Sequence, residues 1–447
     1  MSGAPTQLRA AVVAALFVCA AAGGALAQTA PAQPAPTPAP ATGVLPSGVT
    51  YELRPDPAQR AAAVALWYRA PSTGFGAPAA PGLSRLAAAT VAGSAPITGT
   101  PLGQLVERWG GRLSVAAYPD SVAVTALVPP DHAAQAVRAM TADYFAPVVS
   151  AAGLQLAQRD AGEDAIYRSF GPEAIEDALG AALFADGPLH DGLIGTVTGL
   201  AGIKLDRVHA FAERAFRPSN AILVLTGNVD AGVLAGVASR AGAAKTDPES
   251  AVAQTPRAVP APVRREGNLP GTGLGWIGPP ISTEADATAL DFVADALFAP
   301  RTGVVAKALG TRKALVTGKF VTYRNPGIFL VTISGDDAAA ARPLVDKALA
   351  DAAKPMSQAA FEAARGAFVY RLLSEMETPA DVADTYGWYT VEGAPGYAPA
   401  EGGTRGRYFT LAASLTPSAV AQAVTKYLSA PPAVVTLVKP AAKGTST

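Results

Sequence analysis

GLSRLAAAT, residues 82–90, predicts the first helix of the folded chain because small and apolar residues dominate it. An apolar run typical of a buried strand, AAAVALWYRA (61–70), comes before it, and a loop rich in glycine and proline lies between the two. After it, PLGQLVERW (101–109) predicts a second helix that ends at a pair of glycines. This order of strand, loop and two helices is the frame for the rest of the chain.

The composition narrows the class of protein before any motif is considered. The chain has 447 residues, which is enough for two or more domains, and half of them are hydrophobic. Lysine plus arginine and aspartate plus glutamate are equal at 35 each, so no basic field predicts nucleic-acid binding. We therefore expect a globular protein without a nucleic-acid partner.

The first 27 residues have the features of a secretory signal peptide. Arg9 precedes an apolar run that ends in Ala-Leu-Ala, a typical cleavage signal. We expect cleavage after Ala27, export to the periplasm and no membrane span in the mature protein; the alternative is an uncleaved anchor. The only cysteine, Cys19, lies inside this segment, and Val18 before it does not fit a lipoprotein signal. No lipid anchor, disulfide or cysteine ligand is therefore expected.

The chain divides into two similar parts. In order, we predict a signal peptide (1–27), a Pro/Ala linker (28–42), a first domain (43–243), a polar linker (244–270), a second domain (271–440) and a short tail (441–447). Strand, helix, hairpin, several helices and a closing strand are predicted in both domains, which indicates a duplicated α+β unit. Each unit is expected to be a mostly antiparallel sheet with helices packed on one face. In the first unit, strands at 48–55 and 61–70 are expected to pair.

Three longer segments, found in this order, indicate a family. They are LGQLVERWGGRLSVAAYPDSVAVTALVP (102–129), GPLHDGLIGTVTGLAGI (187–203) and FAERAFRPSNAILVLTGNVD (211–230). With the helix at Gly82, they resemble the pitrilysin/insulinase-type metallopeptidases over about 48–439. The resemblance implies that family's fold, in which the two domains of a chain form half of a clam shell around a peptide.

In this family the first helix reads roughly G-L-A-H-F-L-E-H, and its H-x-x-E-H motif holds a zinc ion. Residues four apart share one helical face, so two histidines can bind one zinc while the glutamate activates its water. The resemblance places Arg85, Ala88 and Ala89 at these three positions. A permanent cation would repel a metal, and alanine offers no ligand. We therefore expect the family fold without a zinc cofactor of its own.

The family takes its third zinc ligand from a glutamate on a later helix, within a pattern like E-R-x-x-x-x-x-E. Arg159 matches the arginine, which places Gln158 on the first glutamate and Ala165 on the ligand. Glu163 and Asp164 are near but are expected on other faces of the helix. A shift of one or two residues in this alignment would restore a carboxylate, but not the two histidines.

The family's second domain supplies an arginine and a tyrosine that hold and polarise the substrate carbonyl, in a segment like L-R-x-x-x-G-L-A-Y. The nearest match is LGTRKALVT, so the resemblance places the arginine on Gly310 and the tyrosine on Thr317. Arg312 and Lys313 are close enough to substitute for the arginine, and Tyr323 follows one strand length later.

The three histidines, His132, His190 and His209, are the remaining nitrogen ligands. His209 and Glu213 stand four apart and could be half of a metal site, although a surface pair is the commoner arrangement. His132 suits a capping turn, and His190 suits a structural role. No G-x-S-x-G elbow or Walker A loop occurs, and the glycine-rich GTGLGWIG (271–278) lacks dinucleotide spacing.

Three hypotheses for the function remain. The leading one is an exported, catalytically inactive homologue of these peptidases, acting as the non-catalytic subunit of a heteromeric zinc peptidase. Zinc is then expected only in the partner subunit. Arg85 could contact acidic or C-terminal groups of a bound peptide, and Arg312 is a second candidate for substrate binding. The alternatives are a stand-alone peptide-binding or scaffold protein of the cell envelope, and an active zinc peptidase with a displaced site.

Overall fold

The fold is described from a computed structural model of the chain. It covers residues 40–440 apart from 96–98, 194, 242–245, 251–252, 261, 325 and 395–406. The predicted signal peptide, nearly all of the first linker and the tail lie outside the described residues. Within the described ranges, no helix is both long enough and apolar enough to cross a membrane.

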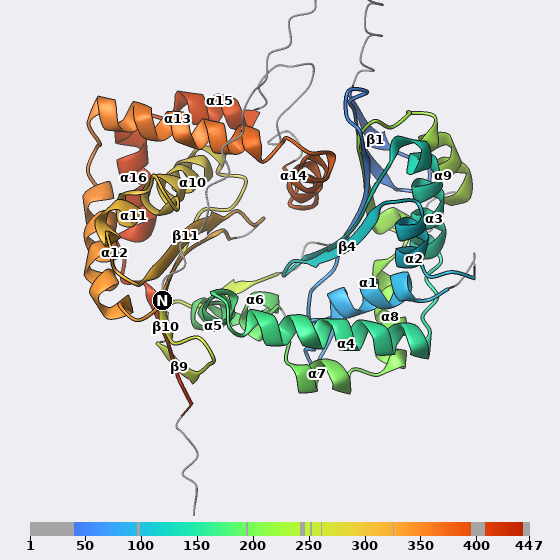
Figure 1. The fold of residues 1–447 in the computed structure, drawn as a ribbon, viewed down its shortest axis with the longest axis horizontal. Helices are drawn as coiled ribbons and strands as arrows, with labels where there is room; N and C mark the ends of the chain where they lie inside the picture. Colours follow the sequence, from blue (N-terminus) through green and yellow to red (C-terminus); the bar gives the residue numbers. More distant parts are fainter. Residues whose placement is uncertain are drawn as a thin grey trace, which may run out of the picture. The chain divides into compact units, whose positions relative to one another are not determined.

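The first half of the chain builds a six-stranded sheet with the order β1-β2-β7-β3-β5-β4 (Figure 1). Its strands are β1 (Ala41–Val44), β2 (Thr50–Pro55), β3 (Ala62–Arg69), β4 (Arg112–Ala117), β5 (Ser121–Val128) and β7 (Ala221–Gly227). Only β2 and β7 run parallel; the other neighbours are antiparallel. The predicted hairpin is present as β4 and β5.

One predicted pairing in this sheet is wrong. The strands expected to pair directly, β2 and β3, are separated by β7, which bonds to both. Every residue of β7 is buried, and nearly all of β3 is, so these two strands take the centre of the sheet. The more exposed β2 is displaced toward the edge.

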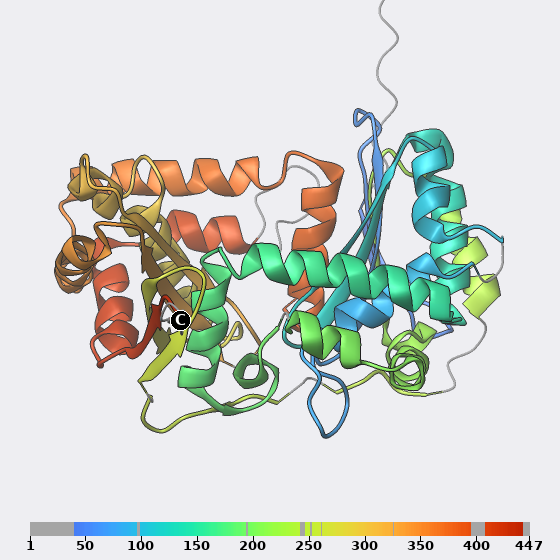
Figure 2. The ribbon, with the colours of Figure 1, turned by 60° about the horizontal axis from the view of Figure 1, so that its bottom comes forward.

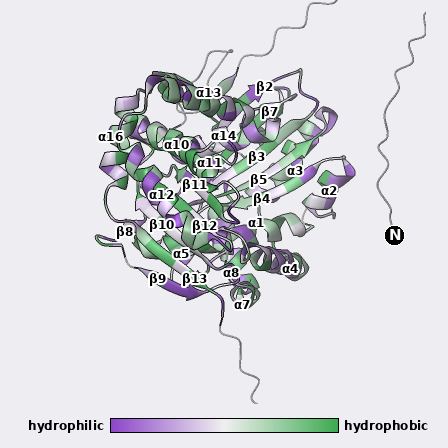
Figure 3. Ribbon diagram, turned by 60° about the vertical axis from the view of Figure 1, so that its left-hand side comes forward, coloured by the Kyte–Doolittle hydropathy of each residue, from purple (hydrophilic) through white to green (hydrophobic). Residues whose placement is uncertain are grey.

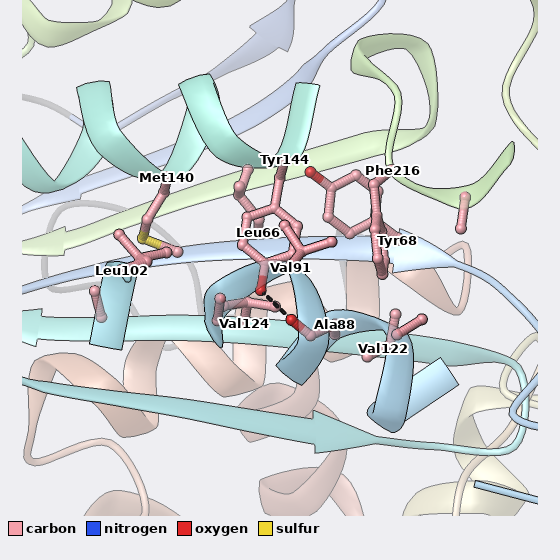
Figure 4. Packing of buried hydrophobic residues seen from close by; sticks show 14 of the residues in the cluster. Leu66, Tyr68, Ala88, Val91, Leu102, Val122, Val124, Met140, Tyr144 and Phe216 are labelled. Carbon is pink, nitrogen blue, oxygen red and sulfur yellow. Dashed lines mark hydrogen bonds between the residues drawn. The ribbon is translucent and has the colours of Figure 1, made fainter. Parts of the chain in front are cut away.

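Nine helices belong to the first half of the chain within the described residues. They are α1 (Leu83–Gly93), α2 (Leu102–Arg108), α3 (Ala133–Phe145), α4 (Ala151–Arg168), α5 (Glu173–Leu183), α6 (Pro188–Asp191), α7 (Val197–Gly202), α8 (Leu205–Ala215) and α9 (Val233–Ala241). Helices α1 and α3 pack on one face of the sheet, and α4 and α8 pack on α1. Figure 4 shows this core, where Leu66 and Tyr68 of β3 meet Val91 of α1 and Tyr144 of α3.

The second half builds a five-stranded sheet with the order β11-β12-β10-β13-β9. Its strands are β9 (Val263–Glu266), β10 (Gly271–Ile277), β11 (Leu315–Val321), β12 (Ile328–Ser334) and β13 (Ala433–Val438). Strand β9 lies in the segment predicted as a polar linker, yet it joins the sheet parallel to β13. A further short strand there, β8 (Thr255–Pro256), pairs with β6 (Phe184–Asp186). The linker is therefore partly built into sheets.

Seven helices belong to this half within the described residues, shown in yellow to red in Figures 1 and 2. They are α10 (Glu284–Phe298), α11 (Val304–Leu309), α12 (Ala338–Ala352), α13 (Gln358–Ser374), α14 (Pro379–Val391), α15 (Arg407–Ser414) and α16 (Pro417–Leu428). Helices α10, α12 and α16 contact the sheet. Two mixed, largely antiparallel sheets packed by helices confirm the predicted α+β class.

Each sheet also carries a helix on its second face, which the sequence did not predict. Alternate residues of β3 point to opposite faces, so Trp67 lies opposite Leu66. Helix α14, from the second half, covers the Trp67 face with Ala383, Tyr386 and Val391. Both faces of the central strands are apolar, which Figure 3 shows as green along β3 and β5. An apolar second face exposed to water would be unfavourable, so it needs this cover.

Helix α5, from the first half, covers the second face of the second sheet. It packs on β10 and β13, with Ile175, Leu179 and Leu183 against the sheet. Alternate glycines of β10 make the close approach possible. A Cβ added at Gly273 would lie 2.5 Å from Ile175 Cγ2, and one at Gly275 would lie 2.9 Å from Leu183 Cδ1. The glycine-rich run is therefore a packing surface for a helix.

Two carboxyl groups meet where the halves join. Asp120 follows β4, and Glu392 caps the end of α14; their carboxyl groups lie close enough to influence each other's pKa, and a hydrogen bond between them requires a proton on one of the two. The backbone N–H of Arg324 donates to Glu392 Oε2 at 2.5 Å. Burial first, and the Asp120 charge second, raise the pKa of Glu392 to about 9. Burial likewise raises the pKa of Asp120.

Substituting Gly387 tests the packing of α14, a helix of the second half, on the first sheet. A Cβ on Gly387 would lie 2.0 Å from Trp67 Nε1, so Gly387→Ala should lower the free energy of unfolding by about 1–3 kcal/mol. On α13, a Cβ added at Gly366 would meet open space, so Gly366→Ala should raise the free energy of unfolding by about 0.5–1 kcal/mol. Urea unfolding measures both. Equal effects of the two substitutions would contradict the packing of α14 on the first sheet.

The acid pair predicts a pH dependence of stability. Glu392 has its pKa raised from 4.5 to about 9 in the folded chain, so its contribution is complete below pH 4.5 and lost as the pH rises through about 9. Glu392→Gln, which mimics the protonated acid, should flatten this decline in urea unfolding measured against pH. The exposed Glu163→Gln should leave the decline unchanged. A parallel wild-type and Glu392→Gln profile would contradict the shared proton.

Candidate functional site

The first candidate site begins at helix α1. Gly82, just before the helix, has a φ of 85°, a left-handed conformation that favours glycine. The Gly-Leu start of the motif therefore has a structural reason that does not depend on a metal. Helix α1 packs along α4, which brings the positions at 85–89 to the helix that carries Ala165.

The alanines at the motif positions belong to the core. Ala88 is fully buried, and its backbone oxygen accepts a hydrogen bond of 2.7 Å from the Tyr144 hydroxyl (Figure 4). Ala89 is partly buried against the same core, and Ala165 is 9% exposed. Methyl groups that pack against apolar neighbours cannot coordinate a cation. These positions now contribute to packing.

Arg85 is bound by a carboxylate of the facing helix. Its Nη1 donates to Asp164 Oδ2 on α4, and Arg168 Nη1 lies 4.0 Å from the same oxygen. The expectation that Asp164 faces away from the motif is wrong: its carboxylate points to α1. Opposite charges on facing helices draw the two side chains together. The sequence alone does not show which carboxylate pairs with Arg85, because that depends on the packing of α1 against α4.

A zinc ion does not fit this group of residues. The positions that the resemblance assigns to the zinc ligands hold a guanidinium group and alanine side chains, and the carboxylate of Asp164 already binds that guanidinium. Among the residues that the structure describes, no cluster of three or more His, Cys, Asp or Glu side chains could hold a metal. Arg85 would have to leave Asp164 before it could contact a peptide carboxylate, so that role stays a prediction.

The histidines occupy three different environments. His132 stacks on Trp109, with ring centroids 5.6 Å apart. Nδ1 of His190 lies 2.9 Å from an oxygen of the neighbouring Asp191. His209 and Glu213 form the expected pair on exposed α8, with His209 Nδ1 3.3 Å from Glu213 Oε2. Each histidine thus has its own local contact, and the structure does not bring the three together.

The second-half positions gather in one pocket of about 470 Å³ beside β11. Gly310 ends α11 with a φ of 58°, and Arg312 Nη1 donates to the Leu309 backbone oxygen at 3.1 Å. Thr317 Oγ1 lies 2.7 Å from Thr332 Oγ1 on the next strand. Gly310, Arg312 and Thr317 all line the pocket, so the structure brings these three positions together.

The same pocket contains charged residues that the sequence did not suggest. Asp291 and Asp295 of α10 and Arg371 of α13 also line it. Arg371 Nε donates to Asp295 Oδ1 at 2.7 Å, and its Nη1 donates to Glu375 Oε1 at 2.6 Å. Burial raises the pKa of Asp291, although Arg371 and the Tyr408 hydroxyl oppose that shift. Tyr323 instead packs on Trp388, 5.6 Å between ring centroids, within the core.

Comparison with known proteins finds homologues among the peptidases. Residues 202–368 match the family described as the Peptidase M16 inactive domain. The chain is a homologue of the pitrilysin-like M16 peptidases. An uncharacterized zinc protease of Mycobacterium leprae is 26% identical to this M16 homologue over 192 residues, which is 42% of either chain. The match thus spans less than half of that relative's length.

Solved structures share the fold over most of the M16 homologue. A protease from Helicobacter pylori has a TM-score of 0.76 and 16% identity, with 90% of this chain and all of that chain covered. A peptidase M16 inactive domain from Pseudomonas fluorescens has a TM-score of 0.74 and 16% identity, with coverages of 90% and 98%. A chain of complex III2 from Candida albicans has a TM-score of 0.71 and 14% identity, with coverages of 88% and 94%. At such identities the likeness establishes the fold.

A double-mutant cycle tests the ion pair. Both side chains keep about a third of their exposure, 31% for Arg85 and 29% for Asp164, so water screens the pair. Arg85→Met and Asp164→Asn should therefore show a coupling of about 0.3–1 kcal/mol in urea unfolding. The same cycle on Arg342 and Asp346, an exposed pair within one helix, is the matched control. A coupling at Arg85–Asp164 that is absent even at low salt would contradict the pairing.

Proposed function

We propose that this M16 homologue is an exported, non-catalytic subunit of a heteromeric zinc peptidase. In that role it forms part of a peptide-binding chamber with a zinc-bearing homologue. The observation that carries the proposal is the Arg85–Asp164 ion pair, which occupies the place of the zinc motif in an otherwise intact M16 fold.

The ion pair favours a partner because it leaves the chain without the family's metal chemistry. The resemblance places Arg85 at the first histidine and Ala88 at the glutamate, and Ala88 is buried in the core, where its backbone oxygen accepts a bond from Tyr144. A peptidase role then needs a second chain that carries zinc and the activated water. The similarity to a chain of complex III2 supports the subunit role, because that structurally similar chain is part of an assembly.

The second-half pocket supports contact with a peptide. Arg312 lines it beside the free edge strand β11, and the resemblance places there the groups that hold the substrate carbonyl. Arg312 already donates to the end of α11, which fixes the guanidinium next to the pocket. A cation held in place can attract an acidic or C-terminal peptide group without a large loss of side-chain entropy. This pocket also favours the second candidate, a stand-alone peptide-binding protein of the envelope.

Periplasmic location is part of the proposal and rests on sequence. The apolar run after Arg9 and the Ala-Leu-Ala ending at Ala27 support export by a cleavable signal. Mass spectrometry of the periplasmic protein should give a chain that begins at Gln28.

Metal content and peptide hydrolysis test the subunit role. The purified chain alone should contain no stoichiometric zinc, and it should raise hydrolysis only when mixed with a zinc-bearing M16 homologue from the same genome. Size-exclusion chromatography of the mixture should give a complex of both chains. The matched control replaces the glutamate of the partner's H-x-x-E-H motif with glutamine, which should keep the complex and remove hydrolysis.

Two outcomes would overturn the proposal. Stoichiometric zinc in the lone chain would mean that its ligands lie elsewhere, and a triple substitution of the histidines would then show whether they bind it. Absence of a complex and of any gain in hydrolysis would reject the subunit role and leave the stand-alone peptide-binding protein.

A further inference from the structure

A small pocket lies between the end of α13, helix α14 and the start of α15. Its volume is about 160 Å³, and its wall is largely aromatic, formed by Trp388, Tyr389, Tyr408, Phe409 and the thioether of Met376. Pockets for whole small-molecule ligands are usually about 300–1,000 Å³. This pocket therefore fits one functional group at the end of a chain, such as the head of a side chain.

Two carboxylates line the same pocket, Glu375 from α13 and Asp384 from α14. Glu375 already accepts a hydrogen bond of 2.6 Å from Arg371. Asp384 accepts one of 3.2 Å from the Tyr118 hydroxyl, and no Lys, Arg or His in the described part of the chain forms an ion pair with it. The pocket thus contains a carboxylate without a cationic partner among the described residues.

The surroundings of Asp384 make a cation favourable. Water reaches its carboxylate, yet the dense protein around it raises its pKa, and the Tyr118 hydroxyl opposes this only in part. An opposite charge beside a carboxylate stabilises its ionised form. Aromatic faces carry negative quadrupole charge and attract cations as well, by about 0.5–2 kcal/mol for each good contact.

We propose that this pocket binds an organic cation, namely an alkylammonium or guanidinium group. An anion would be repelled by Asp384, because Arg371 pairs with Glu375 and not with Asp384, and an uncharged apolar group would bury Asp384 without a cationic partner, which is costly. The described residues offer no third His, Cys, Asp or Glu side chain to make this a metal site. The inference does not depend on the subunit role, because it concerns residues of this chain alone.

The cation could belong to a peptide or to a free amine, and calorimetric titration of the full chain distinguishes the two. The probes are Nα-acetyl-lysine methylamide, Nα-acetyl-arginine methylamide and free butylamine, with Nα-acetyl-norleucine methylamide as the uncharged analogue. Both basic amino-acid derivatives should bind, and the norleucine derivative should bind at least about tenfold more weakly, the loss expected for one charge-assisted contact. If butylamine binds as tightly as the lysine derivative, a free amine is sufficient for binding and the peptide groups contribute nothing.

Variants locate the binding in this pocket. Asp384→Asn should weaken binding of the lysine derivative by about tenfold, because it removes the charge and keeps the shape. Asp384→Glu should restore most of the affinity. Glu377→Gln is the matched control, since it removes one exposed charge near Met376 without lining the pocket. Thermal unfolding of each variant checks that the fold is kept.

Three results would overturn the inference. They are equal binding of the lysine and norleucine derivatives, unchanged binding in Asp384→Asn, and equal losses in Asp384→Asn and Glu377→Gln. A loss in Asp384→Asn that Asp384→Glu does not restore would count against it as well, because the charge would then not be the cause.

Discussion

The structure depends on the burial of both faces of each sheet. The central strands β3 and β7 are apolar on both sides, and the helices of their own half cover only one side. Helix α14, from the second half, covers the other side. Helix α5, from the first half, covers the second sheet in the same way, at β10 and β13. Glycine makes both contacts possible: Gly387 leaves room for the ring of Trp67, and Gly273 leaves room for Ile175. Since either half alone would expose an apolar face, the two halves stabilise each other.

This packing explains how the M16 fold persists without the metal positions. Helix α1 is held by core contacts, and Tyr144 ties its backbone to α3 at Ala88. The contact between α1 and α4 needs no metal, because an ion pair from Arg85 to Asp164 bridges the two helices. If Arg85 stands at the metal position, as the resemblance implies, a fixed positive charge takes the place of the metal ion, and the carboxylate of Asp164 neutralises it.

Helix α14 connects several features that are separate in the sequence. Its apolar face completes the first core, the capping Glu392 lies beside Asp120, whose charge helps to raise its pKa, and Asp384 accepts a hydrogen bond from Tyr118 across the same junction. Asp384 and Trp388 also line the small aromatic pocket. A ligand in that pocket would therefore touch the helix that holds the two halves together.

Local patterns in the sequence determined the elements and the fold class, because alternation and helical spacing depend on neighbouring residues. The hairpin of β4 and β5 and the helix after Gly82 could both be predicted in this way, whereas the assignment of Arg85, Ala88 and Ala89 to zinc-motif positions rests on the family resemblance. Only the tertiary structure decided the insertion of β7 between β2 and β3, the covering of a sheet by a helix of the other half, and the pairing of Asp164 with Arg85. Those outcomes depend on contacts between segments that are far apart in the chain. The burial of apolar surface over the whole fold and the pairing of opposite charges decide which of these contacts form.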